Sequence, residues 1–317
     1  MTTPLDGLHW PISFDSRYGQ DLDRTISFGG GGVFFVAWQV GYLKGLAEAS
    51  VQLNSAKRVV GTSAGSIVAT LFAGKKISGF YEELHLLAKV PQLVSALAPA
   101  ASLKPSQLHA VDLFTRATNA DPDVVRELGR AALAAQAPEQ EVMRRNILLV
   151  ARMRHWPSTI LHTSAVDTYT GERCIVSSDS GISIPAALAA SSAIPGVFPP
   201  QQLADRKCMD GGTAGTGTHL DVLAGSKRAL ILCLRDPQVG HRAEMTQSPQ
   251  ATLAEYEALK ASGTTVFTAS PESFTQSELM DPTAVGKALA MGVRQGSADA
   301  QRVGEFWGDD KGSSKEN

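Results

Sequence analysis

Ser63 lies at the centre of the pentapeptide GTSAG, residues 61–65, which matches the pattern GxSxG. A short apolar run at 58–60 precedes it and a helical stretch at 64–73 follows, so the sequence predicts a strand, a sharp turn and a helix. Such a turn exposes the serine hydroxyl, and the Ala64 amide at the helix N-terminus would face negative charge that develops beside it. The motif therefore predicts a nucleophilic serine.

Four consecutive glycines at 29–32 follow a short apolar strand at 25–28. Backbone amides without a side chain can approach a tetrahedral oxyanion closely, and an acyl hydrolase needs such donors. A dinucleotide-binding loop is the alternative, but Phe35 stands where GxGxxG requires its third glycine, and no GxxxxGK[ST] loop is present. The predicted oxyanion donors in this run are the amides of Gly30, Gly31 and Gly32.

A serine hydroxyl is a weak nucleophile at neutral pH unless a base accepts its proton. Asp210 lies between an apolar residue and two glycines, which is typical of a carboxylate at a turn after a short strand. His219 and His241 lie late enough for the Ser, Asp, His order of an α/β-hydrolase, so a histidine-dependent esterase stays an alternative. Asp167 and Asp221 also stand near turn residues and are the less favoured carboxylates.

Four separated blocks together resemble the patatin-like phospholipase family. They are the glycine run, GTSAG, the block ASSAIPGVFPP at 190–200 and the DGG at 210–212, and they occur in the order of that family. The resemblance implies a three-layer α/β/α fold, a Ser-Asp dyad without histidine, and hydrolysis of acyl chains from phospholipids, lysophospholipids or related esters. No cofactor or metal is expected. Ser63 would be the nucleophile and Asp210 its base, which later activates water. The oxyanion hole would comprise Gly30, Gly31, Gly32 and the Ala64 amide.

The glycine run departs from the pattern of the family. Many members carry Gly-Gly-Gly-x-Arg/Lys-Gly, whereas this chain has Val33, Phe34 and Phe35 after its glycines and lacks the basic residue. In a bacterial subgroup the block is GGGxxGxAW, and the Ala37-Trp38 pair fits that version while Phe35 does not. An inert patatin-like domain that only binds its ligand is therefore a further alternative.

The order of elements over residues 25–73 predicts an α/β fold with a mainly parallel central sheet covered by helices. Residues 79–150 are expected to form a mainly helical side or cap region, with helices at 81–90 and 124–135. The ASSAIPGVFPP block is predicted to follow a rigid, nonhelical path, with Ser191 and Ser192 as caps. Further strands are predicted at 160–166, 172–176 and 229–234, and a closing helix at 282–306. The expected division is an N-terminal extension at 1–20, one catalytic domain at 20–307 and a disordered tail at 308–317.

Composition limits the partners. The 29 basic and 31 acidic side chains nearly cancel, which argues against a nucleic-acid partner, and the basic cluster Arg144, Arg145, Arg152 and Arg154 is predicted as a solvated surface. Three cysteines without metal-ligand spacing and an N-terminus without a signal-peptide pattern favour the cytoplasm. The expected partner is a lipid or acyl ester, with transient peripheral membrane contact. The apolar segment 93–103 is a candidate cap over the substrate, but packing in the hydrophobic core is the favoured prediction for it.

Overall fold

The structure, a computed structural model, describes residue 8 and residues 12–90, 103–239 and 250–308. A central sheet has the strand order β5-β6-β3-β2-β1-β7-β8, with β4 paired to β3. The parallel strands are β1 (Arg24–Phe28), β2 (Arg58–Gly61), β3 (Leu161–Asp167), β7 (Arg228–Leu232) and β8 (Thr265–Ala269). The antiparallel strands are β4 (Arg173–Val176), β5 (Gln201–Leu203) and β6 (Arg206–Asp210). The predicted mainly parallel α/β sheet is confirmed.

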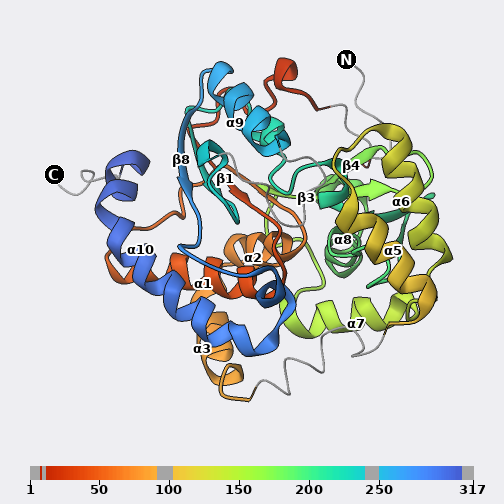
Figure 1. The fold of residues 1–317 in the computed structure, drawn as a ribbon. Helices are drawn as coiled ribbons and strands as arrows, with labels where there is room; N and C mark the ends of the chain where they lie inside the picture. Colours follow the sequence, from red (N-terminus) through yellow and green to blue (C-terminus); the bar gives the residue numbers. More distant parts are fainter. Residues whose placement is uncertain (1–7, 9–11, 91–102, 240–249, 309–317) are drawn as a thin grey trace, which may run out of the picture.

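The central strands are buried on both faces, as continuous apolar runs require. Successive side chains of a strand point to opposite faces, so Leu230 packs with α1 (Gly32–Glu48) and α10 (Val285–Trp307), whereas Ile231 packs with α9 (Ala251–Ala261). Figure 1 shows the result as three layers, with α9 on one side of the sheet and α1, α10 and α2 (Ala64–Ala73) on the other.

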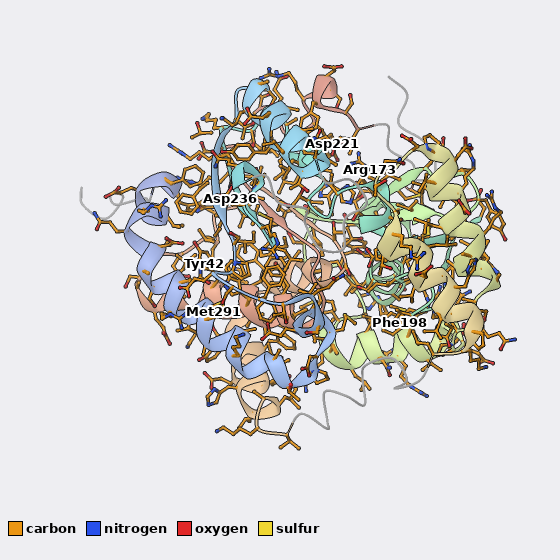
Figure 2. The ribbon with its side chains drawn as sticks, in the orientation of Figure 1. Tyr42, Arg173, Phe198, Asp221, Asp236 and Met291 are labelled. Carbon is orange, nitrogen blue, oxygen red and sulfur yellow. The ribbon has the colours of Figure 1, made fainter. Side chains whose placement is uncertain are left out.

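Helices α1 and α10 pack through glycines. A Cβ atom at Gly41 or Gly45 of α1 would clash with the backbone of α10, and one at Gly292 or Gly296 would clash with that of α1. The close approach lets Tyr42, labelled in Figure 2, donate its hydroxyl to Asp299 at 3.0 Å. The long closing helix thereby holds the helix that begins at the glycine run.

The predicted helical region lies beside the sheet, as Figure 1 shows for α5 and α6. Its helices are α3 (Ile77–Leu87), α5 (Pro105–Arg116), α6 (Pro122–Ala134) and α7 (Gln140–Ala151). Helix α5 begins at Pro105, because a proline at the first helical position loses no hydrogen bond. Of the segment 93–103, all but the last residue lies outside the described residues.

Several elements carry no clear sequence signal. No element was predicted at α8 (Ile184–Ser191), α9, β8 or β5, whereas β6 corresponds to the short strand expected before Asp210. The predicted closing helix is confirmed with a shifted start, since residues 282–284 form a 3-10 turn before α10. Part of the predicted N-terminal extension contacts the domain, where Gly19 donates its N–H to the Ala224 carbonyl at 2.7 Å. The domain boundaries and the tail stay predictions.

No helix within the described part of the chain combines the length and the apolar character that crossing a bilayer requires. The uncharged stretch 181–204 contains only the short helix α8 and the strand β5. Its prolines explain why it does not continue as one helix.

Replacing Gly45 with alanine should lower the free energy of unfolding by about 1–3 kcal/mol, because the added Cβ overpacks the contact with Val293 of α10. Gly79→Ala in α3 is the matched control. A Cβ at Gly79 meets nothing within 4 Å, so the substitution should be neutral or stabilise by up to about 1 kcal/mol. Urea denaturation measures both. Equal effects at the two sites would contradict the close packing of α1 and α10.

Candidate active site

Ser63 occupies the turn between β2 and α2 with a positive φ of 52° and a ψ of −123°. Few residues other than glycine adopt a positive φ, and such strain is typical of functional turns. The flanking glycines make the turn possible. A Cβ at Gly61 would lie 2.5 Å from the Gly65 carbonyl oxygen, and one at Gly65 would clash with Phe28 of β1. The GxSxG spacing therefore follows from backbone packing at this turn.

Hydrogen bonds from distant segments fix this turn. The Ser63 N–H donates to the Ser191 hydroxyl at 3.0 Å, and the Ser66 hydroxyl donates to the Ser63 carbonyl at 2.6 Å. Ser191 is the last residue of α8. Sequence reasoning treated Ser191 only as a cap, and the expected nonhelical path begins only after it, because residues 184–191 are helical. No local pattern marks a hydrogen bond between residues so far apart in the chain.

Asp210 ends β6, and its carboxyl lies beside Ser63. The residue is 3% exposed; Oδ1 accepts the Gly212 N–H at 2.8 Å, while Oδ2 is buried without a hydrogen-bond partner among the described residues. Burial raises the pKa of Asp210 to about 7, against the opposing effects of the Gly212 amide and the nearby Ser63 hydroxyl. A pKa near neutrality suits a general base. The structure thus brings together the two side chains that the sequence singled out.

The glycine run lies against the serine turn. A Cβ at Gly30 would come within 3.3 Å of the Ser63 Cβ, so a larger residue would require the serine turn to shift by a few tenths of an ångström. The Gly30 N–H already donates to the Gly217 carbonyl at 3.2 Å. The amides of Gly31, Gly32 and Ala64 lie at or before the first turns of α1 and α2, where backbone N–H groups have no intrahelical acceptor. Their helical positions leave these three amides without an intrahelical acceptor.

Phe35 points away from the site. Its ring is fully buried and stacks on Trp38 with centroids 5.3 Å apart. Gly31 makes room for it, because a Cβ there would lie 2.7 Å from the Phe35 Cβ. The aromatic residue in place of the third glycine is therefore accommodated by the core beneath the loop.

His219, one of the two histidines considered as a base, has both ring nitrogens engaged by other groups. His219 is buried with Nε2 3.1 Å from the Gly211 carbonyl oxygen and Nδ1 3.2 Å from a nitrogen of Arg173. Burial, and then the charge of Arg173, hold its pKa well below the ordinary value, so the ring is neutral and both nitrogens are engaged. His241, the other histidine considered, lies outside the described residues.

The less favoured carboxylates have structural partners. Asp167 accepts the Tyr169 N–H at 2.7 Å, and Asp221 forms an ion pair with Arg173. In the predicted basic cluster, Arg144 donates to Gln201 and Arg152 pairs with Glu83. Across the described residues, no group of three or more His, Cys, Asp and Glu side chains could hold a metal ion.

An apolar cavity of about 290 Å³ opens beside Ser63. Its volume lies near the lower end of the roughly 300–1,000 Å³ range of ligand sites. Phe198, labelled in Figure 2, belongs to its wall, as do Ser192, Glu83 and Arg152. The apolar lining comes mainly from four helices, α1, α2, α3 and α7, and includes Val36, Ile67, Leu84 and Ile147. A hydrocarbon chain fits such walls.

Comparisons with known proteins give a family match and distant structural matches. A family model described as patatin-like phospholipase matches residues 26–221, more than half of the chain. A comparison with curated proteins finds no match. The solved structure of VipD from Legionella pneumophila is 12% identical with a TM-score of 0.39, covering 95% of this chain and 71% of VipD.

The type III effector ExoU is similar at 18% identity and a TM-score of 0.32, over 87% of this chain and 53% of that structure. The complex of ExoU with SpcU, from the type III secretion system of Pseudomonas aeruginosa, gives 14% identity and a TM-score of 0.31, over 88% and 52%. The chain therefore spans about half the length of the ExoU structures that it matches.

The buried carboxyl predicts a pH-dependent gain of stability in Asp210→Asn. The folded-state pKa of about 7 exceeds the ordinary 3.8, so ionisation favours the unfolded chain above pH 3.8, and this cost grows until about pH 7. At pH 8 the free energy of unfolding of the variant should exceed that of the wild type by a few kcal/mol, and this difference should shrink toward pH 4. Urea denaturation across this pH range measures it.

Asp123→Asn is the control, because that carboxylate is 93% exposed on its side chain and pairs with Arg126 at the surface. Its effect should stay within about 0.5 kcal/mol at every pH. A stability difference for Asp210→Asn that is constant from pH 4 to pH 8 would contradict the raised pKa.

Proposed function

This chain belongs to the patatin-like phospholipase family, and from that premise we propose that it hydrolyses acyl esters of lipids with Ser63 and Asp210 as a catalytic dyad. The observation that carries the proposal is the meeting of a strained serine and a buried carboxyl of pKa about 7 beside an apolar cavity. The serine supplies the nucleophile, the carboxylate the base, and the cavity a place for the acyl chain.

In the first half of the reaction, ionised Asp210 accepts the proton of Ser63 as the serine oxygen attacks the ester carbonyl. The carbonyl oxygen becomes an oxyanion, and the amides of Gly31, Gly32 and Ala64 donate to it. When the tetrahedral intermediate collapses, the ester C–O bond breaks and the proton on Asp210 passes to the leaving alcohol. The acyl group remains bonded to Ser63.

In the second half, Asp210 accepts a proton from water, which attacks the acyl-enzyme carbonyl. Collapse of the second tetrahedral intermediate releases the fatty acid, and the proton returns to Ser63. Gly30, which the sequence also assigned to the oxyanion hole, would donate only after its N–H leaves the Gly217 carbonyl. In the present geometry Gly30 contributes to the site by packing closely against Ser63.

The substrate that best fits is an ester that places one hydrocarbon chain inside the cavity, such as a phospholipid or a lysophospholipid. Most of the cavity residues are apolar, and burial of an acyl chain there gains about 0.8 kcal/mol for each CH₂ group. The Glu83–Arg152 ion pair, 2.6 Å long, belongs to the same lining and provides the polar contacts for a headgroup.

Transient membrane contact is part of the proposal, and the surface around the cavity supports it. Leu86 of α3 and Leu149 of α7 are 63% and 58% exposed, and Val90 follows α3 at 43%. Leu149 and Leu87 also line the cavity. Apolar side chains at the mouth would enter the lipid interface while the cavity accepts one chain from it. With three free, buried cysteines, the enzyme is proposed to work in the cytoplasm.

The dyad is tested by ester hydrolysis and by labelling with a fluorophosphonate. Ser63→Ala and Asp210→Asn should each lower kcat/KM by at least about 1,000-fold, and Ser63→Ala should abolish labelling. Because the base must be ionised, wild-type kcat/KM should rise with pH through about 7. Asp167→Asn is the control, since it keeps an acceptor for the turn amides and should retain wild-type turnover.

Labelling at Ser63 without turnover of short or long acyl esters would leave a reactive serine but no lipid hydrolase, in line with an inert binding module. Full activity of Asp210→Asn would contradict the assignment of the base.

The membrane contact predicts that the double variant Leu86→Ser, Val90→Ser binds anionic phosphatidylglycerol vesicles at least about fivefold more weakly than the wild type, because it removes apolar area from the interface. Cosedimentation measures binding. Leu108→Ser on α5 is the matched control, since Leu108 is 54% exposed but does not line the cavity. An equal loss in the control variant, or none in the double variant, would contradict this contact surface.

A further inference from the structure

The loop at 211–220 joins the two halves of the site. It begins directly after Asp210, and its Gly217 carbonyl accepts the Gly30 N–H of the glycine run at 3.2 Å. A Cβ at Gly217 would lie 3.3 Å from that nitrogen, so the two backbones are in close contact. A displacement of this loop would therefore move both the base and the glycines beside the nucleophile.

His219 ties the far end of the loop back to its beginning. Arg173 donates to Nδ1, so the neutral ring carries its proton on Nε2 and donates it to the Gly211 carbonyl at 3.1 Å. The backbone of His219 is left-handed, with φ of 48°, which lets the ring face Gly211 across the loop. The contact reaches the residue that follows Asp210.

Glu255 of α9 holds the C-terminal end of the loop at 211–220. One oxygen, Oε2, accepts both the Thr218 hydroxyl at 2.7 Å and the Leu220 N–H at 3.3 Å. The Thr218 carbonyl in turn accepts the Ser27 hydroxyl of β1 at 2.8 Å. Burial, and then the charge of Asp221, raise the pKa of Glu255 to about 7. The carboxyl is an acceptor in either protonation state.

Arg173 and Asp221, both labelled in Figure 2, anchor this network. The guanidinium of Arg173, on β4, meets both oxygens of Asp221 at 2.9 and 2.5 Å and also donates to the Ile12 carbonyl. Burial alone would lower the pKa of Arg173, but the hydrogen bonds and charge of Asp221 outweigh it and raise the pKa. Removing one partner of such a pair leaves an unpaired buried charge and strongly destabilises the fold, so neither residue suits a functional test.

We propose that His219 and Glu255 are positioning residues of the hydrolase, which fix the loop at 211–220 so that Asp210 and the glycine run keep their places beside Ser63. This inference rests on the proposed function. Neither residue lines the acyl cavity, so loss of either should slow the chemical step and leave substrate binding unchanged. A misplacement of about 1 Å at a reacting group can cost about 100-fold in rate.

The variants separate positioning from stability. Glu255→Leu removes the acceptor, whereas Glu255→Gln keeps one. His219→Asn tolerates the left-handed backbone and places its amide near the position of Nδ1, so it loses the contact with Gly211. Val222→Ala is the matched control, because it removes core packing from the same 3-10 turn without touching these hydrogen bonds.

The readouts are the rate constant for labelling of Ser63 by a fluorophosphonate, kcat and KM for a soluble ester, and Tm. Glu255→Leu and His219→Asn should slow labelling and lower kcat by at least about 10-fold, with KM within about twofold. Glu255→Gln should stay within about threefold. Val222→Ala should lower Tm yet label at the wild-type rate.

Labelling of Glu255→Leu and His219→Asn at the wild-type rate, or a raised KM with unchanged kcat, would overturn the positioning role. A wild-type protein that labels but hydrolyses no ester would contradict the proposed function alone, and the labelling rates would still decide the role of the network. Wild-type protein that neither labels nor hydrolyses would overturn both.

Discussion

The site depends on the burial of one carboxyl. Asp210 is removed from water next to Ser63, and only neutral groups, the Gly212 amide and the Ser63 hydroxyl, act against the resulting rise of its pKa to about 7. A salt bridge at this position would keep the carboxylate ionised but make it a weak base. The burial costs stability at neutral pH, and the surrounding sheet must compensate for it. Such costs are typical of functional sites, where local stability is exchanged for reactivity.

Close backbone contacts determine where that carboxyl and its partner lie. The Ser63 turn fits between β1 and α2 only because Gly65 has no Cβ, and a Cβ at Gly30 would make a tight contact with Ser63. The α1–α10 glycines and the polar network around His219 act at a greater distance, by holding the helix that starts at the glycine run and the loop that follows Asp210. Contacts outside the site thus fix its geometry.

Short local motifs made much of the site predictable from sequence. The GTSAG turn, the glycine run and the DGG segment each combine special backbone requirements with a reactive side chain, so their residues could be named before their positions were known. The role of Ser191 could not be predicted, because it depends on a hydrogen bond between α8 and the serine turn. The hydrogen bond from the Gly30 amide to the Gly217 carbonyl and the packing of Phe35 beneath Gly31 could not be predicted either, because both depend on tertiary packing. The short elements β8 and α9 lacked periodicity long enough to identify them.

A crystal structure of the protein after reaction with a fluorophosphonate would show the nucleophile, the base and the oxyanion donors around one adduct. We expect phosphorus bonded to Ser63 Oγ, a phosphonyl oxygen within about 3 Å of the Gly31, Gly32 and Ala64 amides, and the Asp210 carboxyl within hydrogen-bond distance of the Ser63 oxygen or of the adduct. An adduct on another residue, or one on Ser63 with Asp210 turned away and its phosphonyl oxygen exposed to water, would contradict this expectation.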